Sequence, residues 1–150
     1  MRLAAFEPDI AQNAAALIRL GACLGVAVDL IEPFGFVFEE SRLKRVAMDY
    51  LALAEVSRHS SWERYLQDRR PGRLVLLTTR AELSYVAFAF EPTDTLLVGR
   101  ESAGVPDAVH ERAEARLKVP LRPPARSLNV VVAAAMVLGE ALRQTRSFPG

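Results

Sequence analysis

Residues 96–106 read Leu-Leu-Val-Gly-Arg-Glu-Ser-Ala-Gly-Val-Pro, an apolar run that passes directly into a loop of glycines, a carboxylate and a hydroxyl. A second run, Val119-Pro120-Leu121, leads into a loop that closes with Arg126-Ser127-Leu128-Asn129 and continues into a helix of small residues. Each run predicts a buried strand that delivers flexible and polar residues to its carboxyl end. Since no other part of the sequence concentrates these residue types, we expect the functional site here.

Short apolar segments alternate with segments of helical periodicity along the chain. Strands are predicted over residues 3–6, 26–31, 74–78, 96–98 and 117–119. Helices are predicted over 10–24, 42–53, 62–69, 107–112 and 128–146, with Ser60 or Ser61 capping the third and Ser127 the last. Strands with apolar residues on both faces, alternating with helices, predict an α/β fold, a mostly parallel sheet flanked by helices. Ligands of such sheets bind beyond the carboxyl ends of the strands, where both loops lie.

The composition is that of a globular protein. The chain has 150 residues, of which 51% are hydrophobic and 25% charged, and we expect a single domain over residues 1–150. The longest apolar run, Val130 to Gly139, is too short to span a membrane, and the N-terminal run, interrupted by Glu7-Pro8-Asp9, is not typical of a signal peptide. A lone cysteine, Cys23, excludes an internal disulfide and suits a cytoplasmic location.

Several function classes find no support in the sequence. The net charge of +1 does not indicate nucleic-acid binding, and although all but two of the 19 cationic residues are arginine, codon bias explains most of them. There is no dinucleotide fingerprint and no P-loop, and the spacing of Ser102 from Gly99 and Gly104 does not fit a nucleophile elbow. The two histidines, His59 and His110, lack a recognisable acidic partner and are expected at the surface. One cysteine and two distant histidines argue against a metal site.

The residues of the two loops allow more than one interpretation. The segment from Gly99 to Gly104 fits a tight turn as well as a loop whose backbone approaches a ligand beside Glu101. Ser127 and Asn129 can cap the last helix, bind a ligand, or do both, because a helix N-terminus presents unpaired N–H donors. The small residues of the last helix indicate close packing, within the chain or against a second subunit.

Motifs spread over nearly the whole chain resemble those of the SPOUT (α/β-knot) methyltransferases, and among them the small tRNA wobble-nucleotide 2′-O-methyltransferases. The resembling segments are Glu7-Pro8-Asp9-Ile10 with Asn13 and Arg19-Leu20; Ile31 to Phe36, Arg42 to Arg45 and Asp49-Tyr50; Gly99 to Pro106; and Val119-Pro120-Leu121 through Asn129. Any one of them alone is a weak signal, whereas their order and spacing are specific.

The resemblance implies a C-terminal trefoil knot, which general connection rules would not suggest. It implies that the knot loops bind S-adenosyl-L-methionine, with Leu77, Gly99, Val119 and Ser127 as the cofactor-binding residues. Leu77 and Val119, together with Leu121, would form the apolar slot for the adenine.

The implied reaction is methyl transfer to the ribose 2′-hydroxyl of a tRNA, at the anticodon wobble nucleotide, cytidine or uridine 34. Arg19 and Asn13 would lie near the hydroxyl, and Glu101 and Asn129 would orient Arg19 or the substrate. Whether Arg19 is the base, or instead binds phosphate and stabilises the oxyanion, stays open. The resemblance also implies a homodimer in which Arg19 of one subunit approaches the pocket of the other.

One segment departs from the family pattern. The family usually carries Thr-Gly-Asn after the motif asparagine, whereas Ala14-Ala15-Ala16 follows Asn13 here. This change leaves two alternatives open beside a tRNA substrate: a 2′-O-methyltransferase for ribosomal RNA, and a non-catalytic member that binds the cofactor or RNA.

Overall fold

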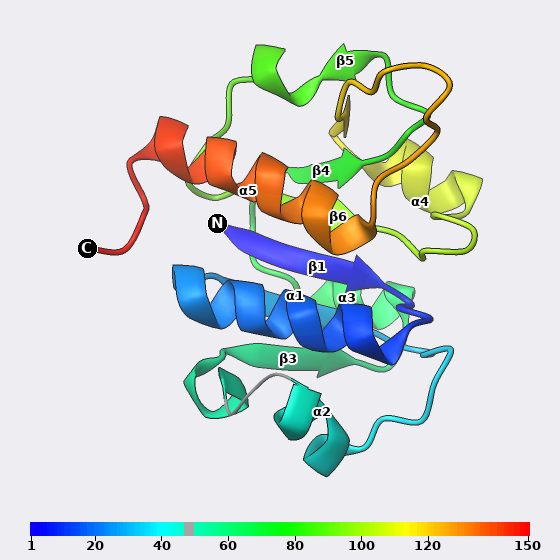
Figure 1. The fold of residues 1–150 in the computed structure, drawn as a ribbon, viewed down its shortest axis with the longest axis vertical. Helices are drawn as coiled ribbons and strands as arrows, with labels where there is room; N and C mark the ends of the chain where they lie inside the picture. Colours follow the sequence, from blue (N-terminus) through cyan, green and yellow to red (C-terminus); the bar gives the residue numbers. More distant parts are fainter. Residues whose placement is uncertain (47–49) are drawn as a thin grey trace.

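A computed structural model of the chain, which describes residues 1–46 and 50–150, contains a seven-stranded sheet in this part (Figure 1). The strands are β1 (Arg2–Phe6), β2 (Ala27–Ile31), β3 (Val56–His59), β4 (Leu74–Leu77), β5 (Leu83–Ser84), β6 (Thr95–Val98) and β7 (Ala115–Lys118). Their order is β3-β2-β1-β6-β4-β7-β5, and all six pairings are parallel. The predicted parallel α/β sheet is therefore confirmed.

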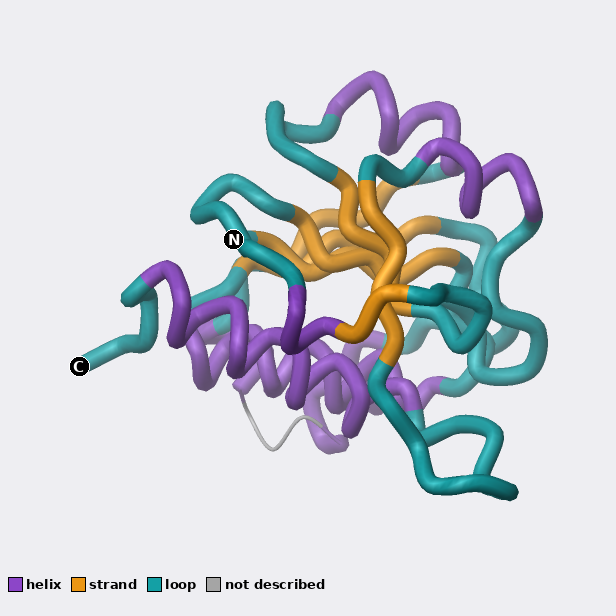
Figure 2. Tube along the Cα trace, turned by 90° about the horizontal axis from the view of Figure 1, so that it is seen from above, coloured by secondary structure: helices purple, strands orange, loops and turns teal. Residues whose placement is uncertain are grey.

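Helices cover both faces of this sheet (Figure 2). They are α1 (Ala11–Leu24), α2 (Glu40–Val46), α3 (Trp62–Asp68), α4 (Asp107–Arg112) and α5 (Val130–Thr145), with two 3-10 helices, η1 (Tyr50–Leu53) and η2 (Tyr85–Ala87). Successive residues of β1 point to opposite faces. Leu3 and Ala5 join a core under α1 and α5, whereas Ala4 and Phe6 join a second core with Tyr65 of α3 and Val109 of α4.

Helix α1 lies unusually close to the sheet. A Cβ atom at Gly21 would come within 2.5 Å of the Val26 carbonyl oxygen and the Val28 side chain, so only glycine fits there. The helix ends at Leu24 and is capped by Gly25, whose φ of 67° is a left-handed conformation that glycine adopts at little cost. This packing sets the position of the N-terminal end of α1, which faces the carboxyl edge of the sheet.

The capping predictions have two outcomes. Ser61 caps α3 as expected, its hydroxyl accepting a hydrogen bond from the Arg64 amide at 3.0 Å. The prediction that Ser127 caps the last helix is wrong, because α5 begins at Val130 and Asn129 is its cap. Asparagine and serine are about equally good caps, so the two residues could not be distinguished by type alone.

Three other segments differ from the sequence prediction. Strand β3 was missed because Ser57, Arg58 and His59 make it polar, and β5 is only two residues long. The helix predicted over 42–53 corresponds to α2 and η1, and residues 47–49, with Asp49 of the middle segment, lie outside the described residues.

Along the described chain, no helix combines the length and apolar character that a membrane crossing needs. The trefoil knot stays a prediction.

Candidate active site

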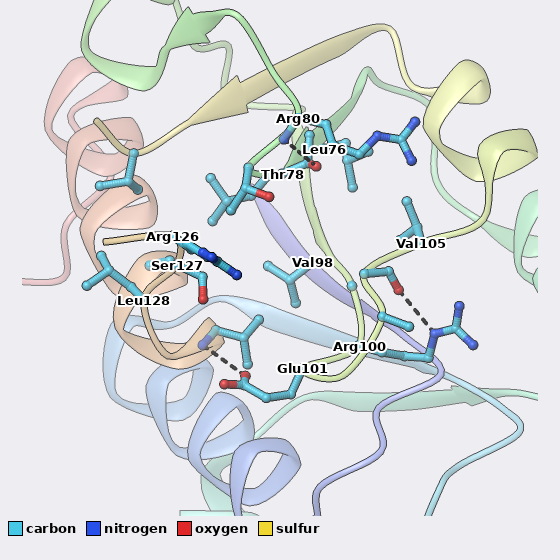
Figure 3. Close-up of a pocket in the computed structure, with 18 of the residues that line it drawn as sticks. Leu76, Thr78, Arg80, Val98, Arg100, Glu101, Val105, Arg126, Ser127 and Leu128 are labelled. Carbon is cyan, nitrogen blue, oxygen red and sulfur yellow. Dashed lines mark hydrogen bonds between the residues drawn. The ribbon is translucent and has the colours of Figure 1, made fainter. Parts of the chain in front are cut away.

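The loops that follow β4, β6 and β7 enclose a pocket of about 390 Å³ at the carboxyl edge of the sheet (Figure 3). This volume is in the range of small-molecule sites, about 300–1,000 Å³. The four predicted cofactor-binding residues, Leu77, Gly99, Val119 and Ser127, all line it. Further apolar side chains of the lining are Leu76, Val98, Leu121 and Leu128. The pocket thus lies where the parallel sheet was expected to bind a ligand.

The loop after β6 is a tight turn that leads Glu101 to the pocket. Arg100 and Gly104 exchange two backbone hydrogen bonds, of 3.0 and 2.9 Å. A Cβ atom at Gly99 would lie 2.7 Å from the carbonyl carbon of Gly104, and Gly104 itself has a φ of 59°. One glycine is needed for a close approach and the other for a left-handed backbone. The predicted tight turn is confirmed and lines the pocket, and the approach of its backbone to a ligand stays a prediction.

The side chain of Asp9, just after β1, holds this loop in place. Its Oδ1 accepts a hydrogen bond from the Glu101 amide at 3.1 Å, and its Oδ2 accepts from the amide of Ser102 at 3.2 Å and from the Ser102 hydroxyl. Burial alone raises the pKa of Asp9, but these hydrogen bonds outweigh it and hold the pKa below its usual value. Asp9 was not predicted as a site residue, although its place beyond the carboxyl end of a strand was a usable signal.

A hydrogen-bonded cluster links α1, the loop after β6 and the start of α5. The Asn129 amide donates to Oδ1 of Asn13 at 3.2 Å, and the Asn13 amide donates to Oε2 of Glu101 at 3.3 Å. The backbone N–H of Val130 also donates to this Glu101 oxygen, at 3.2 Å, a bond drawn in Figure 3. Three of the four predicted catalytic residues, Asn13, Glu101 and Asn129, are therefore brought together.

Asn129 serves two structures at once. Its Oδ1 accepts from the amides of Val131 and Val132 at 2.8 and 3.2 Å and so caps α5, while its amide group reaches Asn13. Capping of the helix and membership of the polar cluster are therefore compatible in one side chain.

Arg19, the fourth predicted catalytic residue, lies apart from this cluster. It is six residues after Asn13 on α1, about 9 Å along the helix axis at a rise of about 1.5 Å per residue. Its guanidinium lies over the ring of Tyr50, 5.0 Å from the ring centroid. Arg19 is not among the described residues that line the pocket of its own chain.

Three arginines line the pocket (Figure 3). The guanidinium of Arg80 lies 3.2 Å from Oδ1 of Asp107, and Nε of Arg100 donates to the Gly104 carbonyl at 3.1 Å. Arg126 is exposed in the loop before α5. Arg80 is thus paired with a carboxylate, so Arg100 and Arg126 are the guanidinium groups of the described lining that lie outside an ion pair with the described residues, and such groups suit a substrate that carries phosphate.

The expectation that both histidines lie at the surface is wrong for His59, and His110 is half-buried. The His59 side chain is only 10% exposed, and its Nε2 lies 2.9 Å from Oδ1 of Asp29. This acidic partner could not be foreseen because β3, which pairs with β2, was not predicted. His110 lines the pocket, and its Nδ1 is buried without a hydrogen-bond partner among the described residues. Burial, together with nearby guanidinium groups, lowers the pKa of His110.

The segment that departs from the family pattern lies in the core. The side chains of Ala14 and Ala15 are fully buried, and Ala15 belongs to the core under α1. Ala16 is half-buried, and none of the three lines the pocket as described. Ala14 and Ala15 therefore serve the packing of α1. Among the described residues, no group of three or more His, Cys, Asp and Glu is placed to hold a metal ion.

Comparison with known sequences identifies close relatives. Residues 1–139 match the SpoU rRNA Methylase family. A tRNA (cytidine(34)-2′-O)-methyltransferase of Ancylobacter novellus is 53% identical over 150 residues, which cover 99% of this chain and 95% of the relative. An enzyme of the same name from Beijerinckia indica is 56% identical over 95% of this chain and 90% of the relative. One from Escherichia coli K12 is 34% identical over 100% of this chain and 96% of the relative.

Solved structures share the fold. One from work on the 2-OH methylation of C/U34 on tRNA superposes with a TM-score of 0.90 at 37% identity, covering 95% of this chain and 94% of the other. The SpoU methyltransferase AviRb of Streptomyces viridochromogenes, solved in complex with AdoMet, gives a TM-score of 0.85 at 24% identity over 96% of this chain and 60% of that one. The second likeness concerns the fold alone.

Proposed function

The chain belongs to the SpoU rRNA methylase family, and we propose that it methylates the ribose 2′-hydroxyl of the tRNA wobble nucleotide, cytidine or uridine 34, with S-adenosyl-L-methionine as donor. The proposal rests above all on the Asn13–Glu101–Asn129 cluster at a pocket of cofactor size. Relatives at 53–56% identity over nearly the full chain carry the name of that reaction.

The residues of the pocket suit S-adenosyl-L-methionine. Leu77, Val119 and Leu121 offer an apolar slot for a flat purine, and Gly99, which lines the pocket without a side chain, would let the cofactor approach the backbone. Ser127 adds a hydroxyl to the lining. When bound, this cofactor supplies a methyl group on a sulfonium, which is activated without a metal ion.

The chain contributes alignment and electrostatics to the reaction. The Asn13–Glu101–Asn129 cluster fixes the start of α1 against the start of α5, so that the amide groups can position the ribose hydroxyl. Arg19 would either accept the hydroxyl proton or stabilise the developing oxyanion while it binds the neighbouring phosphate. The second role suits a guanidinium better, because it stays protonated at neutral pH.

A homodimer would complete the site. Arg19 does not line the pocket of its own chain, so a second subunit is the natural source of the arginine. Helix α5 presents Val132 and Met136, 50% and 42% exposed, on its surface. A Cβ atom at Gly139 would meet nothing within 4 Å, which leaves room for a partner's backbone. Such a small, apolar helix face fits a two-fold interface. We expect this dimer in the cytoplasm, where tRNA is the substrate.

The second candidate is a 2′-O-methyltransferase for ribosomal RNA, favoured by the description of the matching family. The two candidates are separated by competition: purified protein, radiolabelled cofactor and tRNA are mixed with increasing amounts of ribosomal RNA. Labelled tRNA that persists supports the tRNA substrate, whereas label transferred to ribosomal RNA alone overturns it.

A further inference from the structure

Three phenylalanine rings form a continuous aromatic surface in the segment 32–39, which follows β2. The rings of Phe34 and Phe36 are stacked with centroids 5.3 Å apart and planes inclined by 6°, and Phe34 and Phe38 lie 5.6 Å apart at 29°. The guanidinium of Arg58, from β3, lies 4.0 Å from the centroid of Phe38. We call Phe34, Phe36 and Phe38 the phenylalanine cluster.

The members of the cluster differ in how they are anchored. All three are half-buried, but Phe34 and Phe38 pack against the core under α1, whereas Phe36 belongs to neither core. The described ring contact of Phe36 is its parallel stack on Phe34, and the next residue, Val37, is 77% exposed. Phe36 is thus stacked on one face by Phe34 and, of the three rings, is the one that packs against neither core, so it is the ring that we expect to accept a further planar group.

The phenylalanine cluster is attached to the candidate active site. The backbone N–H of Gly35 donates to the Pro8 carbonyl at 3.0 Å, and a Cβ atom at Gly35 would lie 2.8 Å from Cα of Asp9. Asp9 in turn holds the amides of Glu101 and Ser102. The segment after β2 and the pocket loop after β6 therefore meet at the same carboxyl edge, through the Asp9 segment between them.

We propose that Phe36 is a stacking platform for an unpaired nucleobase of the RNA, next to the nucleotide whose ribose is methylated. This inference rests on the proposed function, because a nucleotide whose ribose enters the pocket leaves the stack of its loop and exposes its neighbours. Aromatic rings stack on any base, so the platform adds affinity without dictating sequence. With a net charge of only +1, the protein needs contacts of this kind besides phosphate contacts.

The surroundings of the cluster favour RNA over a second copy of the chain. The guanidinium of Arg58 borders the rings and lies 2.8 Å from Oε1 of Glu32. Helix α2, which follows directly, carries the exposed residues Arg42, 3.7 Å from Glu39, and Arg45, so guanidinium groups flank the aromatic surface and can exchange these carboxylates for RNA phosphates. The exposed apolar face of α5, by contrast, has only Val132 and Met136 on its first two turns and suits a protein partner better.

The test compares Phe36→Leu and Phe36→Trp with the wild type in equilibrium binding to an anticodon stem-loop RNA. Leucine keeps apolar volume but removes the π face, and tryptophan enlarges it. Val86→Ala, an exposed apolar residue near the other sheet edge and outside the pocket lining, is the matched control. We expect Phe36→Leu to weaken RNA binding roughly fivefold or more, the lower end for one base–aromatic stack. Phe36→Trp and the control should bind as tightly as the wild type or tighter.

A second measurement identifies the base. Abasic substitutions on either side of nucleotide 34 should each be compared in wild type and Phe36→Leu. One of them should lower wild-type affinity yet have little further effect in Phe36→Leu, because the same stack is already lost. The fluorescence of Phe36→Trp should also change when RNA is added, beyond the change that Trp62 gives in the wild type.

The outcomes separate this inference from the proposed function. If Phe36→Leu binds and methylates RNA like the wild type, the platform is overturned while the methyltransferase stands. If the wild type binds the stem-loop but never methylates it, the proposed function fails and the binding comparison still decides the platform. If Phe36→Leu loses its dimeric mass in light scattering together with RNA affinity, the cluster covers a second copy of the chain, and the platform is overturned.

Discussion

Arg19 is the residue on which the proposed chemistry depends most, and it lies away from its own chain's pocket. We expect Arg19→Ala to lower methyl transfer to tRNA by about 100-fold or more, the usual effect of losing a group that stabilises a developing charge. Cofactor affinity, measured by calorimetry, should change little, because the contacts proposed for Arg19 are with the RNA and Arg19 does not line the pocket of its own chain. Arg19→Lys keeps the charge but not the planar fork, and partial activity in it would favour a phosphate-binding role. Unchanged turnover in Arg19→Ala would remove this residue from the mechanism.

Asp9 is expected to make the stability of the pocket loop depend on pH. Its carboxylate has a lowered pKa in the folded protein because it accepts hydrogen bonds from Ser102 and from the amide of Glu101. The contribution to stability is therefore fully present above the ordinary value of 3.8 and is lost as the pH falls through the lower, folded value.

The corresponding variant is Asp9→Asn, which does not titrate. Urea unfolding of wild type and variant between pH 3 and pH 7 should show the wild type more stable at neutral pH, with the difference shrinking in the acidic range. A difference that stays constant over the whole range would show that the charge of Asp9 does not stabilise the loop.

At the scale of the element, the turn after β6 should tolerate substitution unequally at its two glycines. Gly99→Ala introduces a Cβ atom 2.7 Å from the Gly104 backbone, so the turn must open and cofactor binding should be lost. Gly104→Ala meets no neighbour and costs only the strain of its positive φ, about 1 kcal/mol.

Gly25→Ala is the matched control for the second change, because Gly25 has a φ of 67° and also meets no neighbour, but lies outside the pocket lining. Gly104→Ala and Gly25→Ala should lower the melting temperature similarly, and Gly99→Ala alone should abolish cofactor binding in calorimetry. Normal cofactor binding by Gly99→Ala would contradict the assigned role of the turn.

Elements with a strong local signal were predictable, whereas those set by distant contacts were not. The strand that ends at Val98 is an apolar run, and helix α4 directly follows a proline, which favours the start of a helix. Strand β3 is polar and forms only by pairing with β2, so its sequence carries little signal, and the His59–Asp29 pair was missed with it. The choice between Ser127 and Asn129 as cap depends on the path of the preceding loop, which residue types do not determine.

The candidate site was predictable in part from the residues and in part only from the resemblance. Position beyond strand ends pointed to the loops containing Glu101 and Ser127, and the structure places both at one pocket. The roles of Asn13 and Arg19, on a helix far away in sequence, came from the resemblance alone. The structure joins Asn13 to Glu101 across 88 positions, a contact that no local pattern encodes.

At the scale of the whole molecule, a site shared between subunits predicts complementation. Arg19→Ala and Gly99→Ala homodimers should each be inactive, the first lacking the arginine and the second the pocket. Subunits exchanged in an equal mixture should regain about a quarter of wild-type activity, since half of the dimers are mixed and each mixed dimer has one intact site. Activity is measured as methyl transfer to tRNA, with light scattering to confirm the dimeric mass. Failure of exchanged dimers to recover any activity would place Arg19 and the pocket of one site in the same subunit.

The fold, the pocket and the polar cluster together support the central proposal, methylation of a tRNA at the ribose of nucleotide 34. The most direct test is transfer of a labelled methyl group to unmodified tRNA with cytidine or uridine at position 34, alongside the same tRNA with a 2′-deoxyribose at that position only. The claim predicts label at nucleotide 34 of the first RNA and none in the second. Equal labelling of both RNAs, or none in either while the cofactor binds, would contradict it.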